Sequence, residues 1–120
     1  MYGIRSEEPP VTPLEAFRSL DVRVGTVTAC DAFPEARKPA WKLTIDFGPE
    51  VGTLRSSAQI TGRYDADSLV GRQVLAAVNL GDRQIGPFVS QCLVLGVRDA
   101  GGAVVLVGPE AGVPDGARLE

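Results

Sequence analysis

Histidine is absent from this sequence of 120 residues. Its absence removes the commonest general base, the Ser-His-Asp and Cys-His catalytic arrangements, and the usual ligand of transition metals. The glycine-rich patterns G-x-x-x-x-G-K-[ST] and G-x-G-x-x-G, which cradle nucleotide phosphates, are also missing. Acidic residues are plentiful but scattered, so no pair of carboxylates stands out as an acid–base couple. We therefore expect a protein that is not an enzyme, with no catalytic residues, no metal site and no cofactor.

Cysteines and long apolar runs are scarce as well. Cys30 and Cys92 lie far apart and form no C-x-x-C pair, so we interpret them as small buried hydrophobic residues or free thiols. The longest apolar runs, such as "VLAAV" and "AVVLV", are only as long as strands, and the initial "MYGIRSEEPPVTP" has no apolar signal core. These features predict a cytoplasmic protein that does not insert into a membrane.

Positive charge is concentrated in the middle of the chain. The net charge of −3 taken alone argues against a nucleic-acid partner. Residues 1–35 and 65–120 are both acidic, whereas residues 36–64 contain only two acids, Asp46 and Glu50. The cations of this basic segment are Arg37, Lys38, Lys42, Arg55 and Arg63. The middle of the chain could therefore bind an anionic partner although the whole protein is acidic.

A short helix is predicted near the N-terminus, after a flexible arm over residues 1–11. In "TPLE", Thr12 can cap the helix, Pro13 suits the first helical position, and Glu15 can complete a capping box. The domain itself is expected to span 12–120. One apolar stripe on the helix needs a surface to cover it, and we predict that it forms a homodimer interface together with the last apolar strand, "AVVLV"; the members of the stripe are Leu14, Phe17 and Leu20.

Two central stretches alternate with the period of two that is typical of half-buried strands. "WKLTIDF" places Trp41, Leu43, Ile45 and Phe47 on one face. "LRSSAQITGRY" places Leu54, Ser56, Ala58 and Ile60 on one side of an extended chain. Every residue on its other side carries a hydrogen-bond donor, namely Arg55, Ser57, Gln59 and Thr61, with Arg63 shortly after.

Further strands complete an all-β pattern. "DVRVGTVTA" is interrupted by Gly25, which suggests a bulge or a tight bend, and "GPEVG" is expected to be a turn. "DADSLVGR" predicts a short helix, "RQVLAAVNL" and "FVSQCLVLGV" predict strands separated by the turn-like "GDRQIGP", and "AVVLV" predicts a last strand. The fold expected from this order is a five-stranded, partly open barrel of the OB type, with a short N-terminal helix and extra C-terminal strands.

Several blocks, in order, resemble the tRNA-binding-domain family: "FRSLDVRVGTV", "FPEARKPAWKLTIDFG", "RSSAQITGRY", "LVGRQVLAAVNL" and "GPFVSQCLVLGV". The resemblance covers roughly residues 13–120 and is greatest to the CsaA branch, described as export-related chaperones. It implies an OB barrel, a homodimer, no catalysis, and binding of tRNA or of unfolded preprotein segments. Where tRNA-binding relatives commonly carry S-x-G-M, this chain has Ser90-Gln91-Cys92-Leu93. That departure weakens the tRNA interpretation and leaves the chaperone interpretation unaffected.

The donor side of residues 54–64 is the candidate ligand-binding face. In an OB barrel it would point outward beside Lys42 and Thr44, where donors and positive charge suit a phosphate backbone or the carbonyls of an extended peptide. A merely solvated face is the alternative. Trp41 and Phe33 could stack on bases, although packing is the favoured role of Trp41. The predicted ligand-binding residues are Arg37, Lys38, Lys42, Arg55, Ser57, Gln59, Arg63, Ser90 and Gln91, with Arg83 as a weaker candidate.

Two functions follow from these observations. The first is a dimeric, CsaA-like chaperone that binds unfolded preprotein segments, with the export machinery as a candidate partner. The alternative is a structure-selective tRNA-binding module. Salt dependence separates them, because binding to a phosphate backbone weakens steeply with salt whereas apolar peptide binding does not.

Overall fold

Helix α1, Pro13–Ser19, begins as its capping pattern predicts in the computed structural model, which describes residues 11–120. The Thr12 hydroxyl accepts a hydrogen bond from the Glu15 amide at 3.2 Å, and the Glu15 carboxylate accepts one from the Thr12 amide at 3.4 Å. The helix has no buried residue, so Leu14 and Phe17 of the predicted stripe are not covered by the barrel. The arm expected over residues 1–11 lies, except for Val11, outside the described residues.

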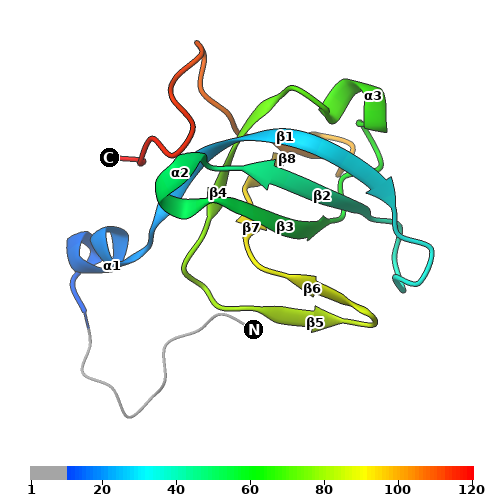
Figure 1. The fold of residues 1–120 in the computed structure, drawn as a ribbon, viewed down its shortest axis with the longest axis horizontal. Coiled ribbons are helices and arrows are strands. Elements are labelled where there is room, and N and C mark those ends of the chain that lie inside the picture. The colour runs from blue at the N-terminus through cyan, green and yellow to red at the C-terminus, as the bar shows by residue number, and fades with distance from the viewer. Residues whose placement is uncertain (1–10) are drawn as a thin grey trace.

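The body of the fold is one five-stranded antiparallel sheet that curls into a nearly closed barrel (Figure 1). Every neighbouring pair of strands runs antiparallel. The chain order and the short helices confirm the predicted all-β, OB-like barrel. In the order in which they pair, the strands are β3 (Thr53–Ala58), β2 (Trp41–Asp46), β1 (Val22–Ala32), β4 (Gln73–Ala77) and β7 (Leu93–Val94).

The alternation in the two central stretches gives the faces of β2 and β3 correctly. Leu43 pairs with Ser56 and Ile45 with Leu54, and these residues point into the barrel. Phe47, Leu43 and Ile45 are among the largest fully buried side chains of the described chain. Lys42 pairs with Ser57 on the outer face. The donor side of β3 therefore lies outside the core, as predicted.

The seam of the barrel, between β3 and residues 90–92, is closed largely by side chains. The Gln91 amide donates to the Arg55 carbonyl at 2.7 Å, and the Gln91 side-chain oxygen accepts from the Arg55 amide at 3.0 Å. The Ser90 hydroxyl accepts from the Ser57 amide at 3.1 Å. The buried Ser56 hydroxyl donates to the Cys92 carbonyl at 2.9 Å. These bonds satisfy backbone groups that a continuous strand ladder would otherwise satisfy.

Gly25 does not form the bulge that the sequence suggested. It pairs regularly with Val74, and the irregularity in β1 lies between Val27 and Ala29. A Cβ atom on Gly25 would lie 2.6 Å from Ile45 Cγ2 and 2.7 Å from Phe47 Cδ1. The glycine therefore allows two core side chains to approach the backbone of β1 closely.

Three local expectations are corrected by the structure. "GPEVG" contains a four-residue helix, α2 (Gly48–Val51), instead of a simple turn. "GDRQIGP" contains a strand, β5 (Arg83–Ile85). "FVSQCLVLGV" breaks into β6 (Phe88–Ser90), β7 and β8 (Gly96–Arg98), because the chain bends past the seam.

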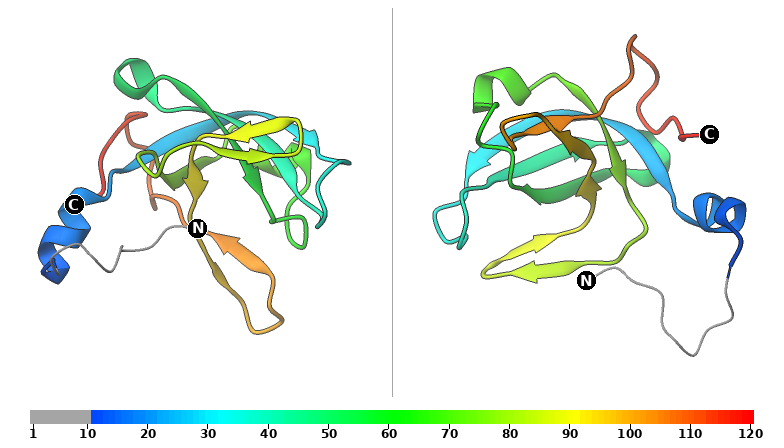
Figure 2. Two further views of the ribbon diagram at one scale, coloured as in Figure 1. Left: turned by 90° about the horizontal axis from the view of Figure 1, so that it is seen from below. Right: turned by 180° about the vertical axis from the view of Figure 1, so that it is seen from behind.

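Two hairpins extend the barrel. Strands β5 and β6 form one, and β8 pairs with β9 (Val104–Leu106) to form the other, which projects from the body in Figure 2. "DADSLVGR" forms a short helix as predicted, α3 (Ala66–Leu69); of the two possible caps in this stretch, Asp65 and Asp67, the structure uses Asp65. Within residues 11–120, no helix combines the length and the apolar character needed to cross a bilayer.

Candidate ligand-binding groove

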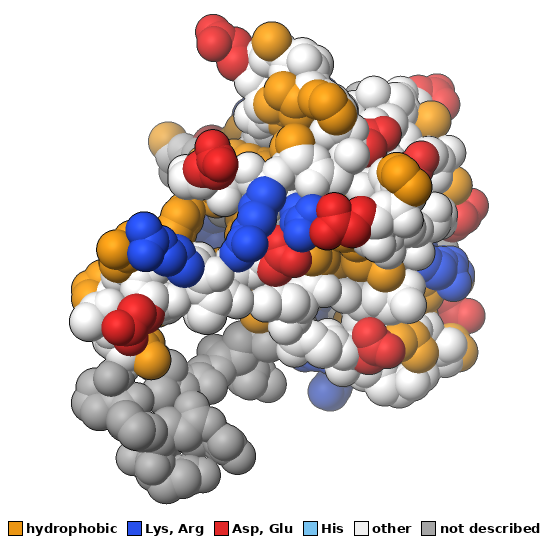
Figure 3. Space-filling model, turned by 60° about the vertical axis from the view of Figure 1, so that its left-hand side comes forward, with side chains coloured by type: hydrophobic (Ala, Val, Ile, Leu, Met, Phe, Trp, Pro, Cys, Tyr) orange, Lys and Arg blue, Asp and Glu red, His pale blue; other side chains and the backbone are white. Residues whose placement is uncertain are grey.

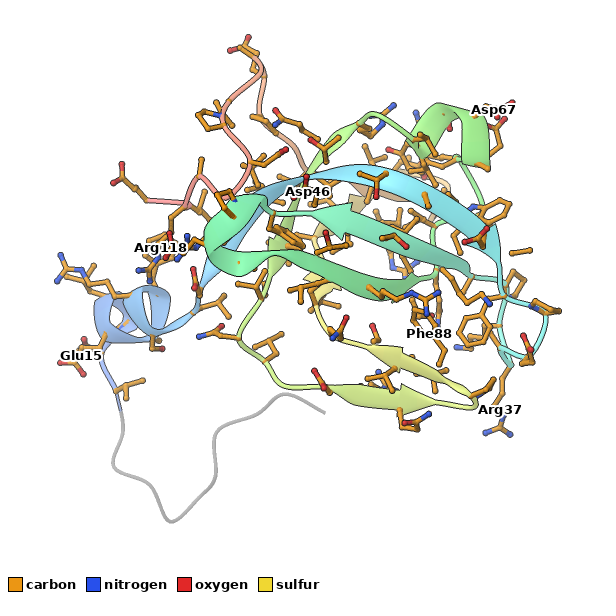
Figure 4. The ribbon with its side chains drawn as sticks, viewed as in Figure 1. Glu15, Arg37, Asp46, Asp67, Phe88 and Arg118 are labelled. Atoms are coloured by element: carbon orange, nitrogen blue, oxygen red, sulfur yellow. The ribbon has the colours of Figure 1, made fainter. Side chains whose placement is uncertain are left out.

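A groove of about 280 Å³ lies between the loop that joins β1 to β2 and the β5–β6 hairpin. The end of β3 provides part of its wall. Figure 4 shows Arg37 at the tip of the loop, near the turn of the hairpin. We call this surface the basic groove; its lining residues are Ala36, Arg37, Lys38, Ala40, Ser57, Gln59, Arg83 and Ile85.

The basic groove carries cations and no acidic residue. Arg37, Lys38 and Arg83 are all exposed. Within residues 11–120, none of the three forms an ion pair with a carboxylate. Glu35 is the one acid of the same loop, and it does not line the groove. The positive charge of the groove is therefore available to an anionic ligand.

Two phenylalanines lie beside the basic groove and connect its walls. The Phe33 ring of the loop and the Phe88 ring of β6 have centroids 5.3 Å apart, and both side chains are buried. The Arg55 guanidinium lies over Phe88 at 4.5 Å, and the Lys42 ammonium lies over Phe33 at 5.6 Å. Packing thus buries the Phe33 ring, so the ring is not available to stack on a base as the sequence suggested.

Trp41 has the packing role that its position in the alternation favoured. Its side chain packs against the core of the barrel. The indole N–H donates to the Tyr64 carbonyl at 2.9 Å. The ring is therefore held on the protein by both its apolar and its polar part.

The structure brings together only some of the predicted ligand-binding residues. Arg37, Lys38, Ser57 and Gln59 line the basic groove, and Lys42 and Arg55 flank it through the two rings. Arg63 follows the end of β3 and forms an ion pair of 3.1 Å with Asp99, next to the β8–β9 hairpin. Ser90 and Gln91 belong to the barrel seam, where their side chains already bind the backbone of β3.

Arg83 and Phe88 are the residues that sequence reasoning undervalued or missed. Arg83 reaches the groove because β5 pairs with β6 and places Arg83 opposite Ser90. The only signal in the sequence was the Gly-Pro pair that follows Ile85 and could turn a hairpin. Phe88 gave no signal, since one aromatic residue in an apolar strand is ordinary core.

The two cysteines are free thiols, as expected, and neither belongs to the groove. Burial raises the pKa of the Cys92 thiol to about 12. Burial also raises the pKa of Cys30, with a smaller contribution from Asp31. Both thiols are therefore protonated near neutral pH and poor nucleophiles. Within the described residues, no cluster of carboxylates and cysteines could hold a metal ion.

Helix α1 and the C-terminal segment form a second surface, at the other end of the barrel. Leu14 is 55% exposed and Phe17 45% exposed. With Leu119 they line a cleft of about 530 Å³, which we call the terminal patch. Leu20, the third residue of the predicted stripe, is half-buried and packs against the barrel instead. Figure 3 shows this side of the molecule, where basic and acidic side chains lie among hydrophobic ones.

Arginine side chains tie the segments next to the terminal patch together. Arg23 donates to Asp21 at 2.6 Å and to the Gly116 carbonyl at 3.0 Å. The hydrogen bond that Arg23 donates to the Asp21 carboxylate is the main reason that the pKa of Arg23 is raised. Arg118 donates to the Arg18 carbonyl at 2.8 Å and lies 3.5 Å from Asp21. These cations are paired, unlike those of the basic groove.

Comparison with known proteins gives consistent matches over most of the chain. The model of the family described as "Putative tRNA binding domain" matches residues 22–118. The crystal structure of the chaperone CsaA from Bacillus anthracis is 44% identical, with a TM-score of 0.84, and the match covers 92% of this chain and 100% of that one. CsaA from Picrophilus torridus is 40% identical with a TM-score of 0.85, at the same coverage.

Methionine–tRNA ligases match as well, over one part of their length. The ligase of Deinococcus radiodurans is 34% identical over 106 residues, which is 88% of this chain and 15% of the ligase. The ligase of Methanothrix thermoacetophila is 33% identical over 114 residues, or 95% of this chain and 16% of the ligase. The matched part of each ligase is therefore about one domain of the present size.

Proposed function

Because this chain belongs to the tRNA-binding-domain family, we propose that it is a non-catalytic module that binds tRNA through the basic groove. The observation that carries the proposal is the set of three cations, Arg37, Lys38 and Arg83, which line one groove without carboxylate partners in the described chain. The ligase activity of the much longer relatives is not part of the proposal.

The chemistry of the groove suits a phosphate backbone better than a neutral ligand. Arginine and lysine neutralise phosphates and release condensed counterions, which supplies much of the affinity for nucleic acid. Ser57 and Gln59 add hydroxyl and amide groups, which commonly bond to phosphate and sugar oxygens. The acidic surface elsewhere on the protein would repel RNA, so binding should be confined to the groove.

Titration of tRNA binding against salt tests this function. With about three phosphate contacts, the logarithm of the association constant should fall linearly with the logarithm of salt concentration, with a slope of about −2 to −3. Gel shift or fluorescence anisotropy with bulk tRNA at several salt concentrations measures it. An unfolded apolar polypeptide titrated in parallel provides the comparison. Affinity for tRNA that does not change with salt would contradict the proposal.

Capture of unfolded preprotein segments is the second candidate function. The observation in its favour is the similarity to two CsaA chaperones over their whole length. In that case the groove would bind the carbonyl groups of extended peptide, the protein would work in the cytoplasm, and the export machinery would be a further partner. The same titrations separate the two functions, because a chaperone would bind the unfolded polypeptide at high salt and suppress its aggregation.

A homodimer is expected to form through the terminal patch. Leu14, Phe17 and Leu119 leave an apolar cleft that a second copy can cover. Light scattering at micromolar concentration should therefore give twice the mass of one chain. Phe17→Glu should give the monomer, because it places a charge in the interface. Val70→Glu, at an exposed valine directly after helix α3, is the matched control and should remain dimeric. A monomeric native protein would refute the prediction.

A further inference from the structure

We propose that Phe88 is a positioning residue of the basic groove, which through its contact with Phe33 sets the distance between the loop and the β5–β6 hairpin. This inference rests on the proposed function, since the groove positioned in this way is the one assigned to tRNA. It assigns a different task to the flanking cations Arg55 and Lys42, which act through the rings rather than on the ligand.

The first support is a small core that is separate from the core of the barrel. Phe33, Ala40 and Phe88 are buried together, and Ala36 and Ile85 pack against them. Phe33, Ala36 and Ala40 come from the loop, whereas Phe88 and Ile85 come from the hairpin. Apart from this cluster, the loop residues 34–39 contain only turns and bends. The rings are therefore the main apolar contact that holds one wall of the groove against the other.

The second support is the position of two cations on the ring pair. The Arg55 guanidinium lies 4.5 Å from the Phe88 centroid, and the Lys42 ammonium lies 5.6 Å from the Phe33 centroid. Arg55 and Lys42 stand on neighbouring strands, β3 and β2. A cation over an aromatic face is attracted by the ring quadrupole, which leucine lacks. The pair is thus held to the barrel by interactions that depend on aromatic rings and not only on volume.

The cations that line the groove and the cations that lie over the rings have different roles in this geometry. Arg37, Lys38 and Arg83 line the groove and would supply the phosphate contacts, so they determine the slope of the salt dependence. Loss of the ring at Phe88 would leave these contacts available but less well placed, since the walls must be ordered when the ligand binds. Affinity should then fall while the slope stays constant.

The test compares the native protein with Phe88→Leu, which keeps an apolar side chain but removes the ring. We expect tRNA affinity to fall roughly tenfold, as the loss of ring–ring and cation–ring contacts implies. The salt slope should not change. In the protein without RNA, amide hydrogen exchange should accelerate at Ala36, whose amide donates to the Phe33 carbonyl at 3.2 Å, and in the β5–β6 hairpin, with the strands of the barrel unaffected. Because the small core is separate from the barrel core, the melting temperature should change little.

Two further variants serve as controls. Val89→Ala changes the next residue of β6, which is exposed and outside the cluster, and should behave as the native protein. Phe33→Leu removes the other ring and should reproduce Phe88→Leu. The double variant should lose little more than either single one, because both disrupt the same contact.

Three results would overturn the positioning role of Phe88. Native affinity together with native exchange in Phe88→Leu would overturn the positioning role, and so would a flatter salt slope, which would mean that a phosphate contact had been lost. Early melting of both single variants, with exchange accelerated throughout the barrel, would also overturn it. If the native protein shows no salt-dependent tRNA binding, the proposed function fails, and the exchange of Ala36 and of the β5–β6 hairpin still decides whether the rings hold the loop against the hairpin.

Discussion

Replacing Arg37, Lys38 and Arg83 together by alanine is expected to lower tRNA affinity by roughly a hundredfold or more and to flatten the salt slope by about two to three units, which leaves it close to zero. The three side chains line one groove and have no carboxylate partner in the described chain, so each can neutralise a phosphate. Thermal stability should change little, because exposed charges contribute little to folding. Anisotropy titrations at several salt concentrations, with a melting curve for each variant, measure both effects.

The matched control removes the same amount of positive charge elsewhere on the protein. Arg18, Arg72 and Arg98 are exposed and lie outside the basic groove. Their combined replacement by alanine should reduce affinity only slightly, through the general field of the molecule. Equal losses in the two triple variants would show that net charge matters and the groove does not. Undiminished binding by the groove variant would show that its cations are merely solvated.

Ile60→Arg is expected to unfold the protein or to reduce its free energy of unfolding by several kcal/mol. Ile60 is 4% exposed and belongs to the barrel core. An arginine there would place a charge among apolar side chains without a partner. Total stability of a domain is about 5–15 kcal/mol, so this single change removes a large part of it. Thermal or urea denaturation followed by circular dichroism gives the measurement.

The neighbouring position supplies the control for this prediction. Gln59 is exposed and lines the groove. Gln59→Arg should melt within a few degrees of the native protein, and its added cation should strengthen tRNA binding. If Gln59→Arg unfolds the protein and Ile60→Arg does not, the two sides of this segment have been assigned the wrong way round.

The barrel faces could be predicted from the sequence because a strict period of two leaves little choice. In β2 and β3 the apolar residues alternate with polar ones, and only one face can be buried. Helix α1 was predictable for a similar reason, because the capping box is a local pattern that acts within one turn. Both predictions depend on residues close together in the chain.

Features that depend on distant contacts were not predictable in the same way. Strand β5 has turn-like composition and exists because it pairs with β6. The stretch from Phe88 to Val97 was predicted as a strand, but it is interrupted where the side chains of Ser90 and Gln91 bind the backbone of β3. Gly25 is a similar case. A glycine is required there because the side chains of Ile45, in β2, and Phe47, directly after β2, approach its backbone closely.

The candidate site likewise combines residues that local patterns could place with residues that depend on distant contacts. Ser57 could be placed on the outer face by alternation, and Arg37 could be placed in the loop by its position between two strands. Arg63 was grouped with them because it follows the donor side, but the strand ends at Ala58 and the alternation no longer applies. The contact between Phe33 and Phe88 joins residues far apart in the chain, so it required the structure.

The placement of the C-terminus beside helix α1 has a consequence for how binding should be measured. Leu119 and Glu120 line the same cleft as Leu14 and Phe17, whereas the basic groove lies at the opposite end of the barrel. A fluorescent protein or an affinity tag fused after Glu120 would crowd this cleft and leave the groove open. Such a fusion would leave a measurement of RNA affinity undisturbed, but it would obstruct the dimer that is expected to form through the terminal patch. The turn at Gly101 and Gly102, between β8 and β9, lines neither surface and is the better place for a label.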